Sequence, residues 1–397
     1  MAVSLKNLMF RFFGFRPHQY RNIKLLDTFN KSYKKILIMS EKQQQDKDVV
    51  LKFLSNVKDP VLKKDIVSLG FIKDLQVDGK QVKIKLSLTS PGCPHKDEIL
   101  SDIVSSLEGY SVMVEVTYNV LSGSLVRKEG TSKVKNIIAV GSGKGGVGKS
   151  TVSILLAYAL KRLGAKVGII DLDFYGATIP SMLGSSFVQN VNEAGLLIPP
   201  IHEGIKIISL AYFVPQNASV IWRGPMLSKA VHDFMEKVDW GELDYLIADL
   251  PPGTGDVPIT LGQDRLINAA LVVSTPQPAA VNVALKLVDT FKKMNVPVIG
   301  GIENMSYFIC PNSKEKVELF GSKYFREKLE ETGLPFLGAL PFTPQLRELE
   351  DVGVKEENIS YIIDDILPVA KELTCRLSVL NSQVSERPFF LNVPKKK

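Results

Sequence analysis

A glycine-rich stretch between a predicted strand and a predicted helix constrains this chain most. It runs from Ile137 to Thr151 and reads Ile-Ile-Ala-Val-Gly-Ser-Gly-Lys-Gly-Gly-Val-Gly-Lys-Ser-Thr. At its start, Asn136–Val140 is a short apolar run with β-branched residues, which is typical of a buried strand. After it, Thr151–Leu163 carries apolar residues at helical spacing and ends at Gly164. A strand, a loop and a helix in this order are the context of a phosphate-binding P-loop.

The residue types of this loop suit a nucleotide phosphate. Glycines let successive backbone N–H groups approach an anion closely, and the helix N-terminus adds its dipole. Lys149 supplies a charge for the β- and γ-phosphates, and the Ser150 hydroxyl can ligate Mg²⁺. A plain glycine-rich turn before a helix is the alternative. The predicted nucleotide-contacting residues are Gly143, Lys144, Gly145, Gly146, Val147, Gly148, Lys149, Ser150 and Thr151.

Two further predicted strands end in aspartates. Lys166–Leu172 carries Asp171 near its end, with Asp173 just beyond it, and Leu243–Leu250 carries Asp249. Strand, loop, helix and strand form a βαβ unit, so the sheet is parallel there and these strand ends face the ligand crevice. Asp249 is placed to hold Mg²⁺ or its water. The alternative for Asp171 and Asp173 is a role as helix caps.

The loop after Asp249 reads Leu-Pro-Pro-Gly-Thr-Gly-Asp and suggests a nucleotide-sensing switch. Its prolines stiffen it, and we expect the Gly253 amide to be free to approach the γ-phosphate. Strands and helices then alternate, which predicts an α/β fold with a doubly wound, mostly parallel sheet. The further predicted elements are strands at Ala270–Thr275, Val296–Ile302 and Pro335–Leu340, and helices at Ala279–Met294 and, interrupted at Pro368, Ile359–Leu377.

A small α+β domain is expected before the P-loop domain, because apolar residues alternate with lysine in a predicted strand that follows a turn at Asp78-Gly79. Its predicted elements are helices at Asp46–Val57 and His95–Leu107 and strands at Lys80–Leu88 and Ser111–Val120. The expected segments are a targeting extension over 1–39, the small domain over 46–120, a linker over 121–135, the P-loop domain over 136–377 and a tail over 378–397.

The net charge of +7 is concentrated at the N-terminus. Residues 1–40 hold eight of the 49 basic residues and one of the 42 acidic ones, so residues 41–397 carry equal numbers of each. We therefore expect no nucleic-acid partner. The basic, amphipathic segment 1–39 is typical of an organellar transit peptide, with the mitochondrial matrix as the expected destination and the plastid as an alternative. A disordered tail, or a true start at Met39 in a cytoplasmic protein, are the other interpretations.

The sequence gives little support for a membrane span, a disulfide framework or a zinc site. No apolar run approaches the ~18 residues of a membrane span, so no integral membrane segment is expected. The three cysteines, Cys93, Cys310 and Cys375, are widely spaced and odd in number, which fits a reducing compartment. The four histidines form no pair at metal-ligand spacing.

The second lysine of the loop, Lys144, resembles that of the deviant P-loop ATPases, a class that includes MinD, ParA and the nitrogenase iron protein. The resemblance implies a homodimer in which Lys144 reaches the partner's nucleotide; a solvated loop charge is the alternative. It also implies that Asp173 orients the attacking water, while Asp171 lies nearer the Mg²⁺ shell.

Several segments together resemble the Mrp/ApbC family of scaffold or carrier ATPases of iron–sulfur cluster assembly. They are Asp171–Pro180, Trp222–Met226, Asp249–Asp256 and Glu303–Ser306. The resemblance implies ATP as the nucleotide, with Asn304 on the adenine, and iron–sulfur apoproteins and other assembly factors as partners. Thr89–Asp97 is similar to the loop of the small iron–sulfur assembly domain of SufT and PaaD. Cys93 in that loop is a candidate cluster ligand or a small helix-cap residue.

One position departs from the family pattern. Members commonly read Cys-Pro-x-Cys after Met-Ser-Tyr-Phe, and two such pairs across a dimer hold one [4Fe–4S] cluster. Here the run is Cys310-Pro-Asn-Ser313, so the second thiolate is missing. Cys310 is therefore either a cluster ligand that needs help from elsewhere or a small core residue. A MinD-like or ParA-like positioning ATPase and a metal-insertion ATPase are the alternative functions.

Overall fold

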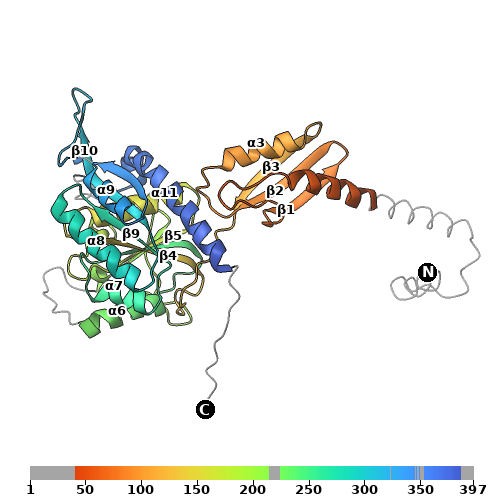
Figure 1. Cartoon of the computed structure of the whole chain (residues 1–397). Helices are drawn as coiled ribbons and strands as arrows, with labels where there is room; N and C mark the ends of the chain where they lie inside the picture. The colour runs from red at the N-terminus through yellow and green to blue at the C-terminus, as the bar shows by residue number, and fades with distance from the viewer. Residues whose placement is uncertain are drawn as a thin grey trace, which may run out of the picture. The chain divides into compact units, whose positions relative to one another are not determined.

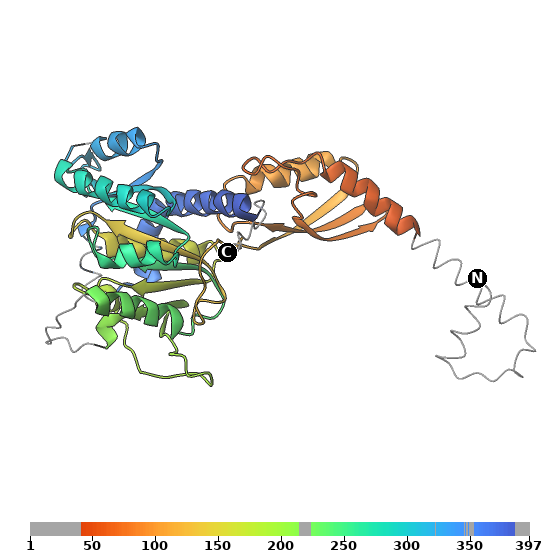
Figure 2. The ribbon, with the colours of Figure 1, turned by 60° about the horizontal axis from the view of Figure 1, so that its bottom comes forward.

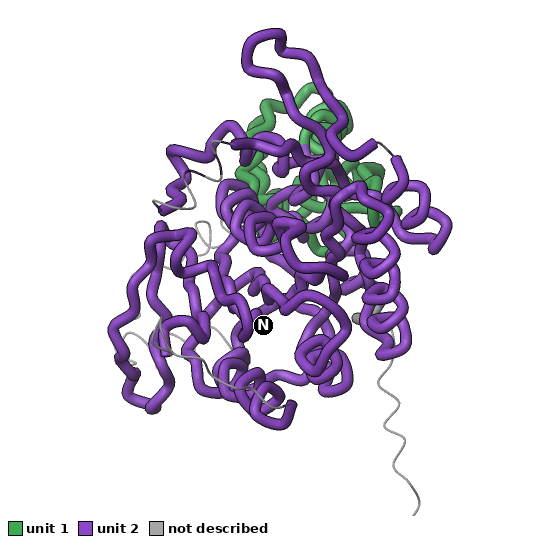
Figure 3. The backbone as a smooth tube through the Cα atoms, turned by 90° about the vertical axis from the view of Figure 1, so that its left-hand side faces the viewer, with its two compact units in different colours: residues 1–86, 97–116 green, residues 87–96, 117–397 purple. Residues whose placement is uncertain are grey.

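The computed structural model divides into two compact units, which Figure 3 colours separately. Unit 1 comprises residues up to 86 and residues 97–116, and unit 2 comprises residues 87–96 and those from 117 onward. The described residues are 41–213, 224–321, 323–344, 346, 348 and 353–385. The predicted extension over 1–39, the pair Trp222-Arg223 and the end of the predicted tail lie outside them. No helix in these ranges combines the length and apolarity needed to cross a membrane.

Unit 1 contains a three-stranded sheet in the order β1–β2–β3, together with helices (Figure 1). The strands are β1 (Ile72–Asp78), β2 (Gln81–Leu88) and β3 (Ser111–Tyr118), and the helices are residues 41–54 and α3 (Lys96–Ser106). β1 and β2 form an antiparallel hairpin through the turn predicted at Asp78-Gly79, where Gly79 adopts a φ of 57°. In β2, Val82, Ile84 and Leu86 are buried, as the alternation predicted.

Unit 2 is built on a nine-stranded sheet in the order β11–β10–β9–β4–β8–β5–β7–β6, with β12 also paired to β10. β6 pairs antiparallel with β7, and β11 pairs antiparallel with β10. The other recorded strand pairs of this sheet are parallel. This confirms the mostly parallel sheet. The strands are β4 (Val134–Ser142), β5 (Val167–Asp171), β6 (Ile201–His202), β7 (Ile205–Ser209), β8 (Leu243–Asp249), β9 (Ala269–Ser274), β10 (Val298–Ile309), β11 (Lys316–Val317) and β12 (Phe336–Pro341).

Helices cover both faces of this sheet, which makes it doubly wound (Figures 1 and 2). One face packs on α4 (Lys149–Arg162), α5 (Ile179–Met182) and α11 (Glu356–Ser385). The other face packs on α6 (Gly224–Glu236), α7 (Asp256–Gln263), α8 (Pro278–Lys293) and α9 (Tyr324–Glu331). Because its central strands are buried on both faces, they read in the sequence as continuous apolar runs.

The C-terminal helix differs from the prediction. α11 runs without a break from Glu356 to Ser385, through Pro368 and eight residues into the expected tail. Proline removes one helical hydrogen bond and costs about 3 kcal/mol in a helix interior. Ile366 and Val369, on either side of Pro368, are buried in the hydrophobic core between α11 and the sheet. The free energy of this burial offsets the cost of the proline.

Candidate functional site

The P-loop connects the carboxyl end of β4 to the first turn of α4. Gly146 and Gly148 adopt φ values of 80° and 76°, a left-handed conformation that other residues rarely take. Gly143 is required for a different reason, because a Cβ there would lie 2.2 Å from the backbone nitrogen of Ala284 in α8. The loop is therefore held close to α8, and its backbone conformation needs the glycines that the sequence provides.

Lys149, at the start of α4, reaches the end of β8. Its Nζ lies 2.6 Å from Asp249 Oδ2, and the Ser150 hydroxyl donates to the same oxygen at 2.6 Å. Ser153, one turn along α4, donates to the other carboxylate oxygen at 2.6 Å. The Asp249 side chain is fully buried, so these three donors stabilise its charge away from water. The predicted phosphate-binding lysine and the predicted Mg²⁺ ligands thus lie together.

Asp171 and Asp173 lie beside this cluster because β5 is the neighbour of β8. Asp171 pairs directly with Asp249 across the two strands, and it accepts hydrogen bonds from Ser209 Oγ at 2.9 Å and from the Asp173 amide at 3.1 Å. The Asp173 carboxylate lies 3.6 Å from Lys149 Nζ. The parallel topology therefore brings the three predicted carboxylates together.

Burial shifts the protonation of these carboxylates. Removal from water, followed by the charge of Asp249, raises the pKa of Asp171 to about 7, and the charge of Lys149 opposes this shift. Burial also raises the pKa of Asp173, again opposed by Lys149. Three carboxyl groups thus share one buried ammonium group, so ionisation of all three is disfavoured unless a further cation binds.

This donor set fits Mg²⁺ bound together with a nucleotide. Among the described residues, no three His, Cys, Asp or Glu side chains are arranged as a cage for a metal ion. Magnesium bound with phosphates usually takes one or two protein ligands and completes its shell with phosphate oxygens and water. The hydroxyl of Ser150 and the carboxylate of Asp249 are suitable ligands of that kind.

Two other predicted residues contact the P-loop differently from expectation. The Gly253 amide is not free, because it donates to the Ser142 carbonyl at 2.8 Å, which joins the loop after β8 to the end of β4. Asn304 is buried, and its Nδ2 donates to the Val147 carbonyl at 2.9 Å. The adenine contact of Asn304 stays a prediction, and so does the dimer contact of Lys144, which is exposed.

Some residues of the site were missed by the sequence analysis. Ser153 follows Lys149 by four residues on a helix that faces the sheet, a spacing that could have identified it. Ser209 comes from β7, a strand that was not predicted, so no sequence signal placed it beside Asp171.

A pocket of about 340 Å³ adjoins Asp173 and is also lined by Tyr175 and Asp256.

The hairpin of β10 and β11 projects from the sheet (Figure 1), and Cys310 follows directly after β10 in its turn. β10 is longer than predicted and leads to Cys310, and β11 returns beside it. The Cys310 amide donates to the Glu315 carbonyl at 2.9 Å, which closes the turn. The Ser313 hydroxyl and then the amides of Ser313 and Asn312 lower the pKa of the Cys310 thiol. Its role as a cluster ligand, and that of Cys93, stay predictions.

Comparisons with known proteins agree with this geometry. A family model described as the NUBPL iron-transfer P-loop NTPase matches residues 133–373, and one described as an iron-sulfur cluster assembly protein matches residues 47–118. The chain is 41% identical to an iron-sulfur cluster carrier protein of Deinococcus radiodurans, over 77% of this chain and 87% of that one. It is 43% identical to a carrier protein of the same name from Synechocystis, over 77% and 90%.

Among solved structures, the chain is similar to a nucleotide-binding protein from Archaeoglobus fulgidus in complex with ADP. The identity is 38% and the TM-score 0.49, with 56% of this chain and 88% of that one covered. The family models and the curated relatives confirm the resemblance that the sequence motifs indicated. The chain belongs to the family of iron-transfer P-loop NTPases and iron–sulfur cluster carrier proteins.

Proposed function

We propose that this protein binds and hydrolyses ATP and carries iron–sulfur clusters to apoproteins. The observation that carries the ATPase proposal is that Lys149 Nζ and the Ser150 hydroxyl both contact one carboxylate oxygen of Asp249 beside the P-loop. Family membership supports the carrier proposal. We expect hydrolysis to be slow and switch-like, because Lys149 must leave Asp249 when nucleotide enters the site.

In the proposed mechanism, Lys149 leaves Asp249 when ATP binds and contacts the β- and γ-phosphates. The P-loop amides hold the phosphate oxygens. Ser150 and Asp249 would hold Mg²⁺, which would neutralise the charge that develops on the phosphate oxygens. Movement of Lys149 also releases Asp173, whose carboxylate then orients the attacking water. Asp171 keeps the end of β5 in place through Ser209 and accepts from the Asp173 amide.

The proposed cluster-handling surface is the hairpin around Cys310. Its lowered thiol pKa favours the thiolate, which is the form that binds iron. Ile309 and Val317 in this hairpin and Phe320 just after β11 are 47%, 42% and 43% exposed, so a second subunit or an apoprotein would find exposed apolar side chains there. A homodimer supplies two Cys310 thiolates, and outside ligands such as small thiols, client cysteines or Cys93 complete a labile [4Fe–4S] cargo.

The proposed location is the mitochondrial matrix, with the plastid as the alternative organelle. The support is the basic, nearly acid-free composition of residues 1–39. Mass spectrometry of the mature protein from its own cells tests this: removal of about the first 39 residues supports import, and an intact N-terminus contradicts it.

The ATPase proposal is tested by comparing Lys149→Ala with Lys161→Ala. Lys161 lies on the same helix, but its Nζ pairs with Glu356 at 2.7 Å, away from the P-loop. Phosphate release under saturating Mg-ATP should fall about 100-fold or more in Lys149→Ala and stay at the wild-type rate in Lys161→Ala. Equal rates for Lys149→Ala and wild type would refute the site assignment.

A further inference from the structure

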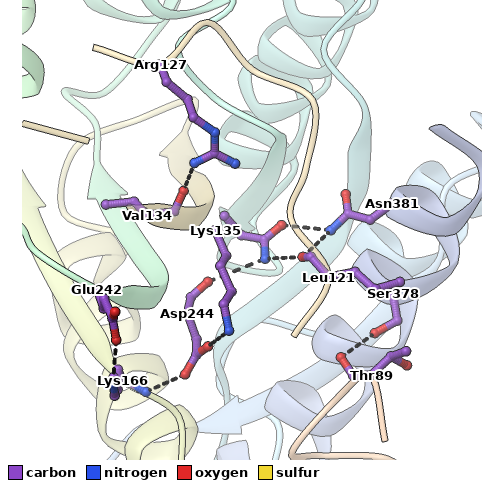
Figure 4. A network of polar contacts seen from close by, with 11 residues as sticks. Thr89, Leu121, Arg127, Val134, Lys135, Lys166, Glu242, Asp244, Ser378 and Asn381 are labelled. Atoms are coloured by element: carbon purple, nitrogen blue, oxygen red, sulfur yellow. Dashed lines mark hydrogen bonds and ion pairs between the residues drawn. The ribbon is translucent and has the colours of Figure 1, made fainter. Parts of the chain in front are cut away.

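A second pocket in unit 2 lies at the opposite edge of the sheet from the P-loop. It has a volume of about 890 Å³ and is lined at the amino ends of three neighbouring strands, by Val134 of β4, Leu243 at the start of β8 and Lys166 just before β5. Figure 4 shows Arg127, Lys135, Lys166, Glu242 and Asp244 of this lining within a network of polar contacts. The P-loop follows the carboxyl end of β4, so the proposed ATPase chemistry does not use this pocket.

The wall of the pocket is held by an amide network. Asn136 and Asn381 both donate to the Leu121 carbonyl, at 2.9 and 3.0 Å, and Asn381 also donates to Asn136 Oδ1 at 2.8 Å (Figure 4). Asn136 and Asn381 are buried. This network attaches the segment after β3 to β4 and to the end of α11. The pocket is therefore preformed, which reduces the ordering cost of binding a ligand.

The two acidic residues that line the pocket already have partners. Asp244 accepts from Lys135 Nζ and from the Lys166 amide, both at 2.9 Å. Glu242 accepts from Lys166 Nζ at 3.1 Å. Each carboxylate is thus matched by one lysine, Asp244 by Lys135 and Glu242 by Lys166, and the charges of these four side chains cancel.

Two more cationic residues, Arg127 and Lys133, line the pocket in addition to these pairs. Lys166 lowers the pKa of Glu242, and the charge of Lys133 adds to this effect. Arg127 donates to the carbonyls of Val134 and, at 3.5 Å, Gly123. Within the described ranges, no carboxylate forms an ion pair with Arg127 or with Lys133. Partial burial lowers the pKa of the Arg127 guanidinium, as expected for a cation removed from water without a counterion. The lining therefore carries an excess of two positive charges, and the Ser122 and Ser132 hydroxyls add donors.

We propose that this pocket binds a small polyanion with phosphate or clustered carboxylate groups, contacted by Arg127 and Lys133. Guanidinium and ammonium groups with nearby hydroxyls are the donors that such oxyanions require. The volume lies within the ~300–1,000 Å³ of small-molecule sites. A nucleic acid is a poorer fit, because residues 41–397 have balanced charge and a net of two positive charges in the lining makes a small footprint.

The test is a titration of the full-length protein with citrate and, separately, with inorganic pyrophosphate. The P-loop is first saturated with Mg-ADP so that pyrophosphate cannot bind there. Calorimetry gives the affinity, and hydrogen exchange shows whether amides of residues 127–135 become protected. The variants are Arg127→Gln and Lys133→Gln, with Lys128→Gln as the matched control, because Lys128 belongs to the same segment and does not line the pocket.

The proposal predicts binding of at least one of the two probes, with protection over residues 127–135 and weaker binding at higher salt. Arg127→Gln should weaken binding about tenfold and Lys133→Gln about threefold, while Lys128→Gln should bind as wild type does. Citrate-only binding identifies carboxylates, and pyrophosphate-only binding identifies phosphates. Lys133→Gln keeps the test valid if Arg127→Gln does not fold, because Lys133 is exposed. The proposal is overturned if neither probe binds at about 10 mM, or if both variants bind with wild-type affinity.

Discussion

Lys149 Nζ lies 2.6 Å from Asp249 Oδ2, and this carboxylate is fully buried. The proposed mechanism needs both groups for Mg-ATP, yet here Lys149 and Asp249 contact each other. We therefore expect nucleotide binding to be an exchange of partners, in which Lys149 gives up a buried ion pair for phosphate oxygens. Because breaking a buried pair is costly unless both charges find new partners, ATP and Mg²⁺ should bind far better together than ATP alone.

Asp249→Asn should reduce ATP hydrolysis about 100-fold or more, because an amide cannot hold Mg²⁺ as a carboxylate does. Asp264→Asn is the matched control, since Asp264 pairs with His232 on the surface at 2.9 Å. Steady-state phosphate release checks the rates, and circular dichroism checks that both variants are folded. Wild-type turnover by Asp249→Asn would mean that this carboxylate does not act on the metal.

ATP should favour a dimer in which Lys144 of each subunit approaches the other's phosphates. In Asp173→Asn, intended to trap ATP, light scattering should show twice the monomer mass. Adding Lys144→Ala should return the trapped protein to monomers, while adding Lys161→Ala should leave it dimeric. A trapped form that stays strictly monomeric would remove the role of Lys144 across the interface.

The alkylation rate of Cys310 should rise at lower pH than that of an ordinary thiol, whose pKa is about 8.5. The thiolate is the reactive form, and hydrogen bonds led by the Ser313 hydroxyl lower the thiol pKa, so reactivity appears as pH rises through that lowered value. Ser313→Ala should move the midpoint upward. Asn312→Ala should not, because Asn312 acts through its backbone amide. Iodoacetamide labelling, read by peptide mass spectrometry across pH, separates these outcomes.

The elements around the nucleotide site could be predicted from the sequence because their signals are local. β4 and β8 are buried on both sides, so each reads as an apolar run, and the P-loop glycines are dictated by backbone geometry. The parallel connection predicted that Asp171 and Asp249 both lie at the carboxyl ends of their strands, but it did not predict that β5 and β8 are neighbours.

Other features depended on tertiary contacts that no local pattern records. β1 was missed because only Leu75 and Val77 in it are buried, between exposed polar residues. Pro368 was expected to break a helix that packing keeps continuous. The Gly253 amide was expected to be free, but the Ser142 carbonyl, far away in sequence, accepts from it.

The most direct test of the carrier account is anaerobic reconstitution of wild type, Cys310→Ala and Ser313→Cys, with iron and sulfide measured after desalting. A [4Fe–4S] cluster normally takes four thiolates, and two subunits supply two Cys310 side chains, so wild type should load weakly. Cys310→Ala should load none, and Ser313→Cys should load clearly more than wild type because it restores the second thiolate. Cys310→Ala that retains as much iron and sulfide as wild type would contradict the account.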